Sequence, residues 1–364
     1  MSLDTVALTE YFNRRGVEIS GMLTCTKFSH GQSNPTYLVK DSIGKKFVLR
    51  KKPDGLLISK TAHAVEREFR IQDALGRNTD VPVPKMVFLC EDTTIIGTPF
   101  YVMEFVEGRI FVDPALPEIP KEERWAYLQE MTRVLALIHS VKYKDIGLNG
   151  YGKDGGYYTR QCISLSRIHG DQASSIYKGT NKTVGDLPQF TKVSNWLKNT
   201  YCPDEITIVH GDYKLDNVIF DKKLPKIIGV LDWELSTIGN PRADLANMIQ
   251  FFQYPSTRRL IAGRPPSEID ESADPSELER IVQTYCKLTN HTYPLEGLFY
   301  AFIFSFFRNS IIYHGIEARS ARGQAASDHA KRVGALGPPT MIRAANMIEE
   351  YSEKNVKTSH TSKL

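Results

Sequence analysis

The sequence lacks the features that mark secreted, zinc-stapled or membrane-spanning proteins. Its five cysteines are widely spaced, odd in number and form no Cys-x-x-Cys pair, so we expect neither a disulfide framework nor a structural zinc site. The first twenty residues contain no charged-then-apolar leader, so secretion is not expected. The most apolar run, residues 298–307, is too short to cross a bilayer and predicts a buried helix rather than a membrane contact.

Charge and repetition exclude further classes. The formal net charge of +4 over 364 residues is too small to indicate a nucleic-acid partner. No repeat at solenoid or propeller periods is visible. The composition, 41% hydrophobic and 24% charged, is that of an ordinary globular protein. The length exceeds the usual size of one hydrophobic core and predicts two lobes.

Periodicity along the chain separates these lobes. Turn-bounded apolar runs at 35–42, 45–52 and 99–106 predict strands, and residues 61–75 have helical spacing. After a proline-rich connector, helical patterns dominate, interrupted by short apolar runs at 205–233. We therefore predict an α+β, bilobal fold. Its segments are a β-rich N-lobe (1–105), a larger helical C-lobe (106–350) and a flexible tail (351–364).

The segment HGDYKLDN, residues 210–217, carries the strongest chemical signal. Asp212 and Asn217 lie five positions apart on a loop between two apolar runs. Phosphoryl transfer needs a carboxylate that accepts the proton of the attacking hydroxyl and an amide oxygen that holds magnesium near the phosphates. Lys214 could neutralise charge on the transferred group. Asp212 and Lys214 are therefore the candidate catalytic residues.

A second acidic segment follows at the end of another predicted strand. In IIGVLDWELS, Asp232 leaves the strand and Glu234 lies two residues later. Carboxylates suit a hard cation that bridges ATP phosphates, so Asn217, Asp232 and Glu234 are the candidate metal ligands. The alternative interpretation is that these residues only form turns and caps, in which Asp and Asn are frequent.

These two segments resemble the catalytic and metal loops of aminoglycoside phosphotransferases, choline kinases and their relatives, which are similar to protein kinases in fold. The resemblance implies a protein-kinase-like bilobal fold that uses ATP and Mg²⁺, with Asp212 as catalytic base. Protein kinase activity is a further alternative. It is disfavoured because Asp-Trp-Glu replaces the Asp-Phe-Gly of protein kinases and no Ala-Pro-Glu follows.

The predicted N-lobe supplies candidate nucleotide-binding residues. Gly31, Ser33 and Asn34 form a turn-prone connection whose backbone amides could approach phosphate, although a simple hairpin turn would look the same. Arg50 stands at the strand position that resembles the phosphate-contacting lysine of kinases, with Lys52 as the alternative. We predict Glu68 as the ion-pair partner of Arg50.

Two further expectations concern the adenine base of ATP and the predicted helix that carries Glu68. Backbone groups from Glu104 to Val106 resemble the hinge segment that reads the adenine edge of ATP. Glu66 lies two residues before Glu68, and so points to another side of the helix.

Finer resemblance extends over nearly the whole chain. FVLRKKP, AHAVEREFRI and LDWELSTIGNPRADLAN are similar to the kinase-like domain of acyl-CoA dehydrogenase family member 10/11-type proteins. That branch implies a hydroxyacyl-CoA acceptor in fatty-acid catabolism, with a separate dehydrogenase acting downstream. An amino alcohol, sugar or aminoglycoside-like acceptor, or a pseudokinase module that only binds ATP, stays open. Aromatic residues are plentiful but form no visible box for a choline-type amine.

The last three residues give an expectation about location. Ser362, Lys363 and Leu364 form an S-K-L sequence, which a peroxisomal import receptor reads as an address. The preceding polar stretch would present it to that receptor. The sequence therefore predicts a peroxisomal enzyme.

Overall fold

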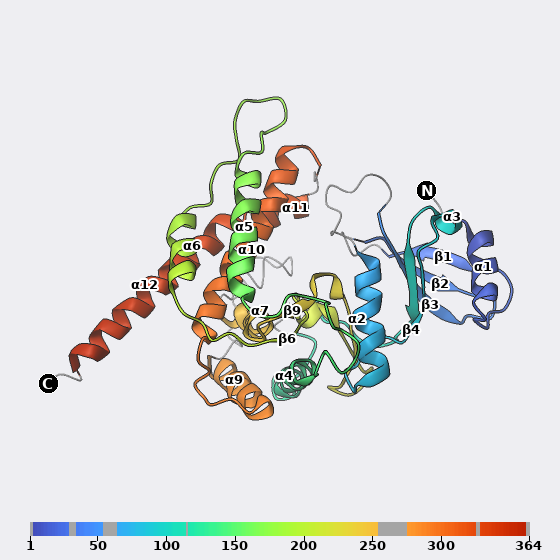
Figure 1. Ribbon diagram of the computed structural model, residues 1–364, viewed down its shortest axis with the longest axis horizontal. Coiled ribbons are helices and arrows are strands. Elements are labelled where there is room, and N and C mark those ends of the chain that lie inside the picture. Colours follow the sequence, from blue (N-terminus) through green and yellow to red (C-terminus); the bar gives the residue numbers. More distant parts are fainter. Residues whose placement is uncertain are drawn as a thin grey trace. The chain divides into compact units, whose positions relative to one another are not determined.

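The chain divides into two compact units, each assembled from separate stretches of sequence. The computed structural model describes residues 3–28, 34–53, 64–113, 116–253, 275–324 and 328–361 (Figure 1). Unit 1 comprises residues 1–110, 140–151 and 210–237, and unit 2 comprises 111–139, 152–209 and 238–364. The predicted boundary at 105/106 assumed contiguous lobes. In the structure, the segment with the HGDYKLDN and LDWE motifs groups with the N-terminal sheet.

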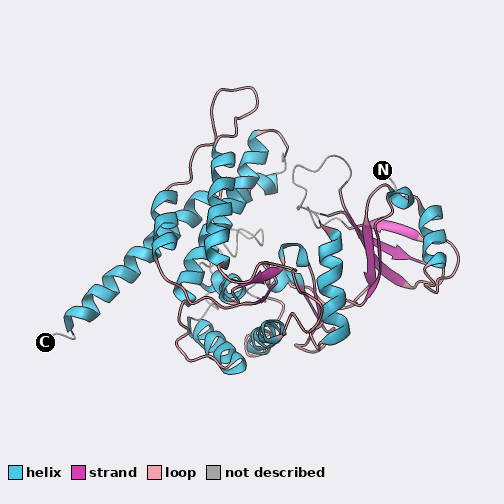
Figure 2. Cartoon of the chain, in the orientation of Figure 1, coloured by secondary structure: helices cyan, strands magenta, loops and turns pink. Residues whose placement is uncertain are grey.

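Unit 1 is built around an antiparallel sheet of five strands in the order β1-β2-β3-β5-β4. Strands are drawn in magenta in Figure 2. The strands are β1 (Thr24–Lys27), β2 (Thr36–Lys40), β3 (Lys46–Lys51), β4 (Met86–Cys90) and β5 (Phe100–Glu104). The three strands predicted from alternation are confirmed as β2, β3 and β5, whereas β1 and β4 were not predicted. Gly44 has a φ of 91° in the β2–β3 turn, a conformation that favours glycine.

Helices cover both faces of this sheet. On one face, Phe12 of α1 (Thr5–Arg14) packs among buried residues that include Phe47 and Leu49. On the other, Val65 of α2 (Val65–Asn78) packs with residues that include Val48. Strand alternation assigns odd and even positions of β3 to opposite faces, so Arg50 shares the α2 face with Val48. A short helix, α3 (Thr93–Ile96), precedes β5.

The rest of unit 1 consists of short elements that carry the two motifs. The hairpin of β7 (Val218–Phe220) and β8 (Ile227–Val230) is antiparallel. The 3₁₀ turn η1 (Leu215–Asn217) precedes β7, and η2 (Trp233–Leu235) follows β8. Strand β6 (Thr207–Val209), which directly precedes the HGDYKLDN segment, pairs with β9 (Thr237–Gly239). Both motifs therefore sit at the ends of short strands, as predicted.

Unit 2 is helical. Its described helices are α4 (Arg124–Ser140), α5 (Tyr157–Ala173), α6 (Phe190–Asn199), α7 (Arg242–Gln253), α9 (Pro275–Thr289), α10 (Leu298–Ala321), α11 (Asp328–Gly334) and α12 (Gly337–Thr361). Helix α10, whose first ten residues form the most apolar run, packs against α5, α6, α7, α11 and α12 (Figure 1). The predicted buried helix is confirmed. None of the described helices combines the length and apolar character that a membrane crossing requires.

Aromatic side chains that are scattered in the sequence meet in the core of unit 2. The ring of Tyr158 lies 4.9 Å from the rings of both Tyr300 and Phe304, and Trp196 lies 5.8 Å from Tyr300. Edge-on and offset arrangements of this kind add to the stabilisation from area burial. These contacts join α5, α6 and α10, and they explain why the aromatic content is high without a visible aromatic motif.

Two buried histidines in the same unit lie ring against ring. The centroids of His169 and His314 are 5.2 Å apart, and Leu187 donates its backbone N–H to Nε2 of His169 at 3.1 Å. Burial and the neighbouring His314 lower the pKa of His169, opposed by Asp186. Burial also lowers the pKa of His314, opposed by a backbone hydrogen bond to Gly185 and by Glu317 and Asp186. Both imidazoles are therefore harder to protonate in the folded state than in the unfolded chain.

We expect unit 2 to lose stability in mild acid. Below the unfolded histidine pKa of about 6.5 the unfolded chain binds protons that folded His169 and His314 reject, so the free energy of unfolding falls as pH drops. Urea unfolding at several pH values between about 7.5 and 5.5 measures this slope. His169→Gln keeps an acceptor for the Leu187 N–H and should flatten the slope. An identical slope in the variant contradicts the assignment.

Candidate active site

The loop after β6 is organised by a histidine with a fixed tautomer. His210 is completely buried, and its Nδ1 accepts the backbone N–H of Asp212 at 3.1 Å. Because Nδ1 is an acceptor, Nε2 carries the proton and donates to the carbonyl of Leu231 at 2.9 Å. His210 thus holds the backbone of Asp212 and ties it to the second loop.

Further backbone contacts bring the two loops together. The N–H of Leu231 donates to the carbonyl of Asn217 at 2.8 Å. Gly211 has a φ of 86°, and a Cβ there would lie 2.5 Å from the carbonyl oxygen of Leu235. Only glycine fits this position. The loop with Asp212 and Asn217 therefore packs directly on the segment with Asp232, as the shared-cation prediction requires.

One carboxylate oxygen of Asp212 interacts with the side chains of both Asn217 and Lys214. Its Oδ2 accepts Nδ2 of Asn217 at 2.9 Å and lies 3.2 Å from Nζ of Lys214. Asn217 Nδ2 also donates to the Asp212 carbonyl at 2.8 Å, and Lys214 lies 3.4 Å from Asp216. These contacts orient the carboxylate through Oδ2. Asp212, Lys214 and Asn217 are brought together as predicted.

Charge pairing sets the protonation of this cluster. Burial lowers the pKa of Lys214, but Asp212 and Asp216 outweigh it and raise the pKa above its ordinary value. Burial raises the pKa of Asp216, opposed by Lys214, and nearby Asp212 raises it further. Lys214 therefore stays cationic beside Asp212. Asp216, the second carboxylate that forms an ion pair with Lys214, was not predicted.

Asp232 is held in a strained backbone conformation. Its φ of 63° and ψ of 58° are left-handed, which a residue other than glycine adopts at a cost of about 1–3 kcal/mol. Trp233 next to it is buried, and its Nε1 donates to the carbonyl of Val230 at 3.0 Å. The anchored indole keeps the turn in place, and the Asp232 side chain remains one-third exposed. Strain of this kind is concentrated at functional sites.

Arg50 connects the sheet to the acidic segment. Its Nε lies 3.1 Å from Oε2 of Glu68, an ion pair without an aligned hydrogen bond. Its Nη2 donates to Oδ1 of Asp232 at 2.7 Å and to Oε2 of Glu234 at 3.2 Å. The predicted Arg50–Glu68 pairing is present. The additional bonds to Asp232 and Glu234 were not predicted, because they depend on how the β7–β8 hairpin meets the sheet.

Glu66 and Glu68 point to different sides of α2, as helix geometry predicted. Lys52 pairs with Glu66 rather than with Glu68, so the two acidic residues of α2 serve different cations. Burial raises the pKa of Glu68 to about 7, opposed by Arg50 and increased by Asp232 and Glu234. Arg50 is thus one guanidinium shared among three carboxylates.

Hydrogen bonds that were not predicted connect helix α2 to the acidic segment. Nη2 of Arg67 donates to the carbonyl of Ser236 at 3.3 Å, and the hydroxyls of Tyr151 and Ser236 are 2.6 Å apart. Arg70 donates to the carbonyls of Gly147 and Asn149, both at 2.9 Å. These bonds fix the helix that carries Glu68.

The side-chain oxygens of the two loops suit a divalent cation. Asp232 and Glu234 offer carboxylates, and Asn217, whose Nδ2 is engaged, offers Oδ1; all three are hard ligands of the kind Mg²⁺ takes. The guanidinium between Asp232 and Glu234 shows that this position stabilises positive charge. Within the described residues, no group of three or more His, Cys, Asp or Glu is arranged to hold a metal by itself. Bound phosphates would have to complete the coordination.

The remaining predicted nucleotide contacts are only partly described. Gly31 and Ser33 lie outside the described residues, whereas Asn34 is buried and its side chain contacts Glu68. Glu104 ends β5, and its N–H donates to the carbonyl of Lys85 at 2.9 Å. Val106 is half-buried just beyond the strand. Contacts of these residues with a nucleotide stay predictions.

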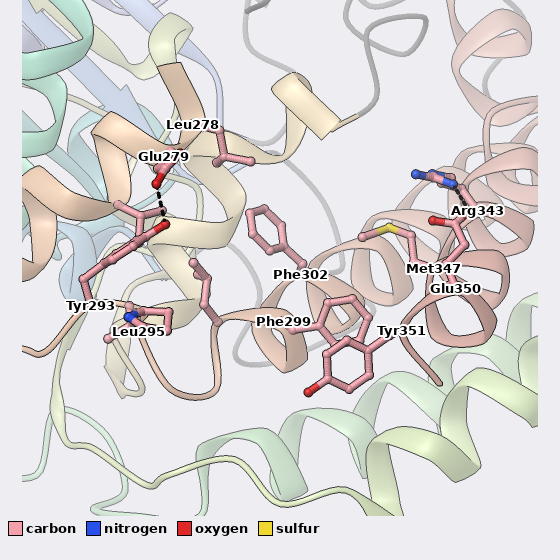
Figure 3. A pocket seen from close by; sticks show the side chains of 13 residues that line it. Leu278, Glu279, Tyr293, Leu295, Phe299, Phe302, Arg343, Met347, Glu350 and Tyr351 are labelled. Carbon is pink, nitrogen blue, oxygen red and sulfur yellow. Dashed lines mark hydrogen bonds and ion pairs between the residues drawn. The ribbon is translucent and has the colours of Figure 1, made fainter. Parts of the chain in front are cut away.

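Unit 2 contains a separate cavity of about 550 Å³ between α9, α10 and α12 (Figure 3). Its walls are largely apolar and aromatic, with Phe299 and Phe302 projecting from α10. The polar groups at its edge pair with each other, Tyr293 with Glu279 at 3.1 Å and Arg343 with Glu350 at 2.8 Å. The cavity holds none of the predicted catalytic residues.

Comparison with known proteins agrees with this geometry. Residues 24–290 match the family described as "Phosphotransferase enzyme family". The chain belongs to this family. The predicted relationship to aminoglycoside phosphotransferases and the kinase-like bilobal fold are confirmed, and this phosphotransferase is a small-molecule kinase by family.

Curated relatives of the phosphotransferase are longer proteins. Acyl-CoA dehydrogenase family member 10 from Mus musculus is 38% identical over 92% of this chain, which covers 30% of the relative. Acyl-CoA dehydrogenase family member 11 from Gallus gallus is 33% identical over 95% of this chain and 43% of the relative. The phosphotransferase thus spans less than half the length of these relatives.

Solved structures with a similar fold include aminoglycoside phosphotransferases. A protein from Ralstonia eutropha, provisionally described as an aminoglycoside phosphotransferase, is 33% identical, with a TM-score of 0.78, covering 96% of this chain and 99% of that one. Aminoglycoside phosphotransferase APH(4)-Ia, in a ternary complex with ADP and hygromycin B, is 13% identical with a TM-score of 0.56, over 92% and 97% of the two chains. At that identity the likeness concerns the fold alone.

Replacement of Asp212 by Asn should lower turnover by about two to four decades, because the amide cannot accept a proton. Nucleotide affinity, measured by calorimetry with AMP-PNP, should change little. Asp221→Asn is the matched control, since Asp221 caps a turn in the same unit by accepting the N–H groups of Lys223 and Leu224. Full turnover in the Asp212 variant would refute the assigned role.

Proposed function

We propose that this phosphotransferase transfers the γ-phosphoryl group of ATP to the hydroxyl of a small-molecule acceptor, with a hydroxyacyl-CoA as the preferred acceptor class. The observation that carries the proposal is the Asp212 carboxylate. It is oriented through Oδ2 by Asn217 and Lys214, on a loop packed against the Asp232 segment. A proton acceptor placed beside a set of hard oxygen ligands is what phosphoryl transfer requires.

In the proposed reaction, the acceptor oxygen forms a bond to the γ-phosphorus while the bond from that phosphorus to the bridging oxygen of ADP breaks. Asp212 receives the hydroxyl proton, and ADP leaves. Lys214, kept cationic by Asp212 and Asp216, lies where it can stabilise negative charge on the transferred group. Asn217 and Asp232, with Glu234, would hold Mg²⁺, which neutralises phosphate charge when bound.

Use of ATP is supported by the neighbours of this fold. APH(4)-Ia variants have been crystallised with ADP or with AMP-PNP together with hygromycin B. Arg50 adds support from the chain itself, because an arginine can meet phosphate oxygens through two nitrogens. Its Nη2 lies at the acidic segment, where the phosphates and the cation would meet.

The acceptor class rests on the relatives. The proteins named acyl-CoA dehydrogenase family members 10 and 11 contain the region that matches this chain as 30–43% of their length. An acceptor that is an acyl-CoA with a free hydroxyl would connect a kinase to such proteins, with a dehydrogenase in a partner chain acting on the phosphoester. The Ralstonia protein, provisionally described as an aminoglycoside phosphotransferase, favours sugar-like acceptors as the second candidate.

An acceptor screen tests the proposal. The protein is incubated with ATP and Mg²⁺ together with hydroxyacyl-CoA, choline, sugar or aminoglycoside acceptors, and the acceptor is analysed by mass spectrometry for the gain of one phosphate. We expect phosphate on the hydroxyacyl-CoA and none in the Asp212→Asn reaction. Phosphate on an aminoglycoside and none on the hydroxyacyl-CoA would contradict the proposed acceptor class. Binding of AMP-PNP without transfer to any acceptor would indicate a nucleotide-binding module.

We also propose a peroxisomal location, on the basis of Ser362, Lys363 and Leu364, which lie outside the described residues. A fluorescent protein fused before residue 1 should accumulate in peroxisomes of cultured cells, and removal of the last three residues should leave it diffuse. A scrambled Lys-Ser-Leu ending is the matched control. Unchanged peroxisomal accumulation after the deletion would contradict the proposal.

A further inference from the structure

The carboxylate of Glu68 is buried and surrounded by donors from three elements. It is 1% exposed, and its Oε1 accepts Nδ2 of Asn34 at 2.7 Å. Its Oε2 accepts the hydroxyl of Tyr101 at 3.1 Å and faces Nε of Arg50 at the same distance. A carboxylate offers about four lone-pair sites, of which these two hydrogen bonds fill two, while Arg50 contributes an ion pair without an aligned hydrogen bond.

The register of the sheet explains how these donors meet. Arg50 on β3 lies opposite Thr36 on β2 and opposite Tyr101 on β5. Side chains of directly opposed residues share a face, so Tyr101 and Arg50 both reach toward α2. Asn34 stands two residues before Thr36, whose hydroxyl donates to the Asn34 carbonyl at 3.1 Å. The neutral donors therefore come from β5 on one side of Arg50 and from the segment just before β2 on the other.

Neutral donors are needed here because the single cation is shared. Nη2 of Arg50 is drawn toward Asp232 at 2.7 Å and Glu234 at 3.2 Å, while only Nε faces Glu68. A carboxylate buried beside one shared guanidinium would be poorly compensated. Asn34 and Tyr101 supply hydrogen bonds to Glu68 without adding charge that would compete for Arg50.

We propose that Asn34 and Tyr101 are positioning residues, which lock Glu68 so that Arg50 presents its guanidinium to the phosphates of the nucleotide. The inference rests on the proposed function, because it assumes that Arg50 contacts phosphate. Both residues act through Glu68, and the hydroxyl of Tyr101 and the amide of Asn34 are the groups that matter.

The primary test is Tyr101→Phe, which removes the hydroxyl and keeps the ring. Affinity for AMP-PNP with Mg²⁺ should weaken about three- to ten-fold, the range expected for one lost hydrogen bond. KM for ATP should rise similarly, with KM for the acceptor unchanged. Tyr300→Phe is the matched control, since its buried hydroxyl donates to the Leu197 carbonyl in unit 2. It should leave nucleotide affinity unchanged.

A double-mutant cycle with Glu68→Gln separates positioning from general destabilisation. If Tyr101 acts through Glu68, its replacement should have little effect on nucleotide affinity in the Glu68→Gln background. Asn34→Asp, which puts a second carboxylate against Glu68, should weaken binding more than Asn34→Ala. If the Asn34 variants do not fold, the Tyr101 cycle decides alone.

The outcomes distinguish this inference from the proposed function. Wild-type protein that fails to bind AMP-PNP with Mg²⁺ would overturn the proposed function. Wild-type binding with unchanged affinity in Tyr101→Phe would overturn only the positioning role. So would an equal effect of Tyr101→Phe with and without Glu68, or an effect no larger than that of Tyr300→Phe.

Discussion

The structure of unit 1 depends on one shared guanidinium. Arg50 lies 3.1 Å from Glu68, 2.7 Å from Asp232 and 3.2 Å from Glu234, so it joins the sheet, helix α2 and the acidic segment. A lysine at this position would offer one ammonium point charge, whereas the planar fork of arginine addresses partners in two directions. The arginine therefore does more than replace a kinase lysine. It holds the candidate metal ligands in register with the strand that would meet the nucleotide.

Backbone contacts make the catalytic loop part of the same assembly. The imidazole of His210 bonds both Asp212 and Leu231, and Gly211 passes so close to Leu235 that no side chain could fit. Because these contacts involve backbone atoms, the Asp212 loop and the Asp232 segment form one packed assembly. The left-handed backbone of Asp232 is tolerated in this setting. Rigid placement of this kind is the main requirement of a reaction governed by positioning and electrostatics.

The sequence was most informative where chemistry and local periodicity coincide. The short strands that end just before His210 and Asp232 follow from the spacing of apolar residues, and the Arg50–Glu68 pair follows from the resemblance to kinases together with helix geometry. The hydroxyl of Tyr101 could not be placed, because its contact with Glu68 depends on the register between β3 and β5. The discontinuous units were likewise unpredictable, since long-range packing, rather than composition, assigns 210–237 to the sheet.

Acceptor specificity is harder to read than transfer chemistry for a physical reason. The residues predicted to orient a hydroxyl and to hold phosphates are a few polar and charged residues at fixed spacings, all within unit 1. Unit 2 is made of helices whose sequence pattern records burial, as in α10, where most side chains pack against neighbouring helices. Many different small molecules can be bound by apolar walls with a few polar groups, so helical periodicity does not distinguish among them. Family membership therefore fixes the reaction type, and the acceptor must be established by its own chemistry.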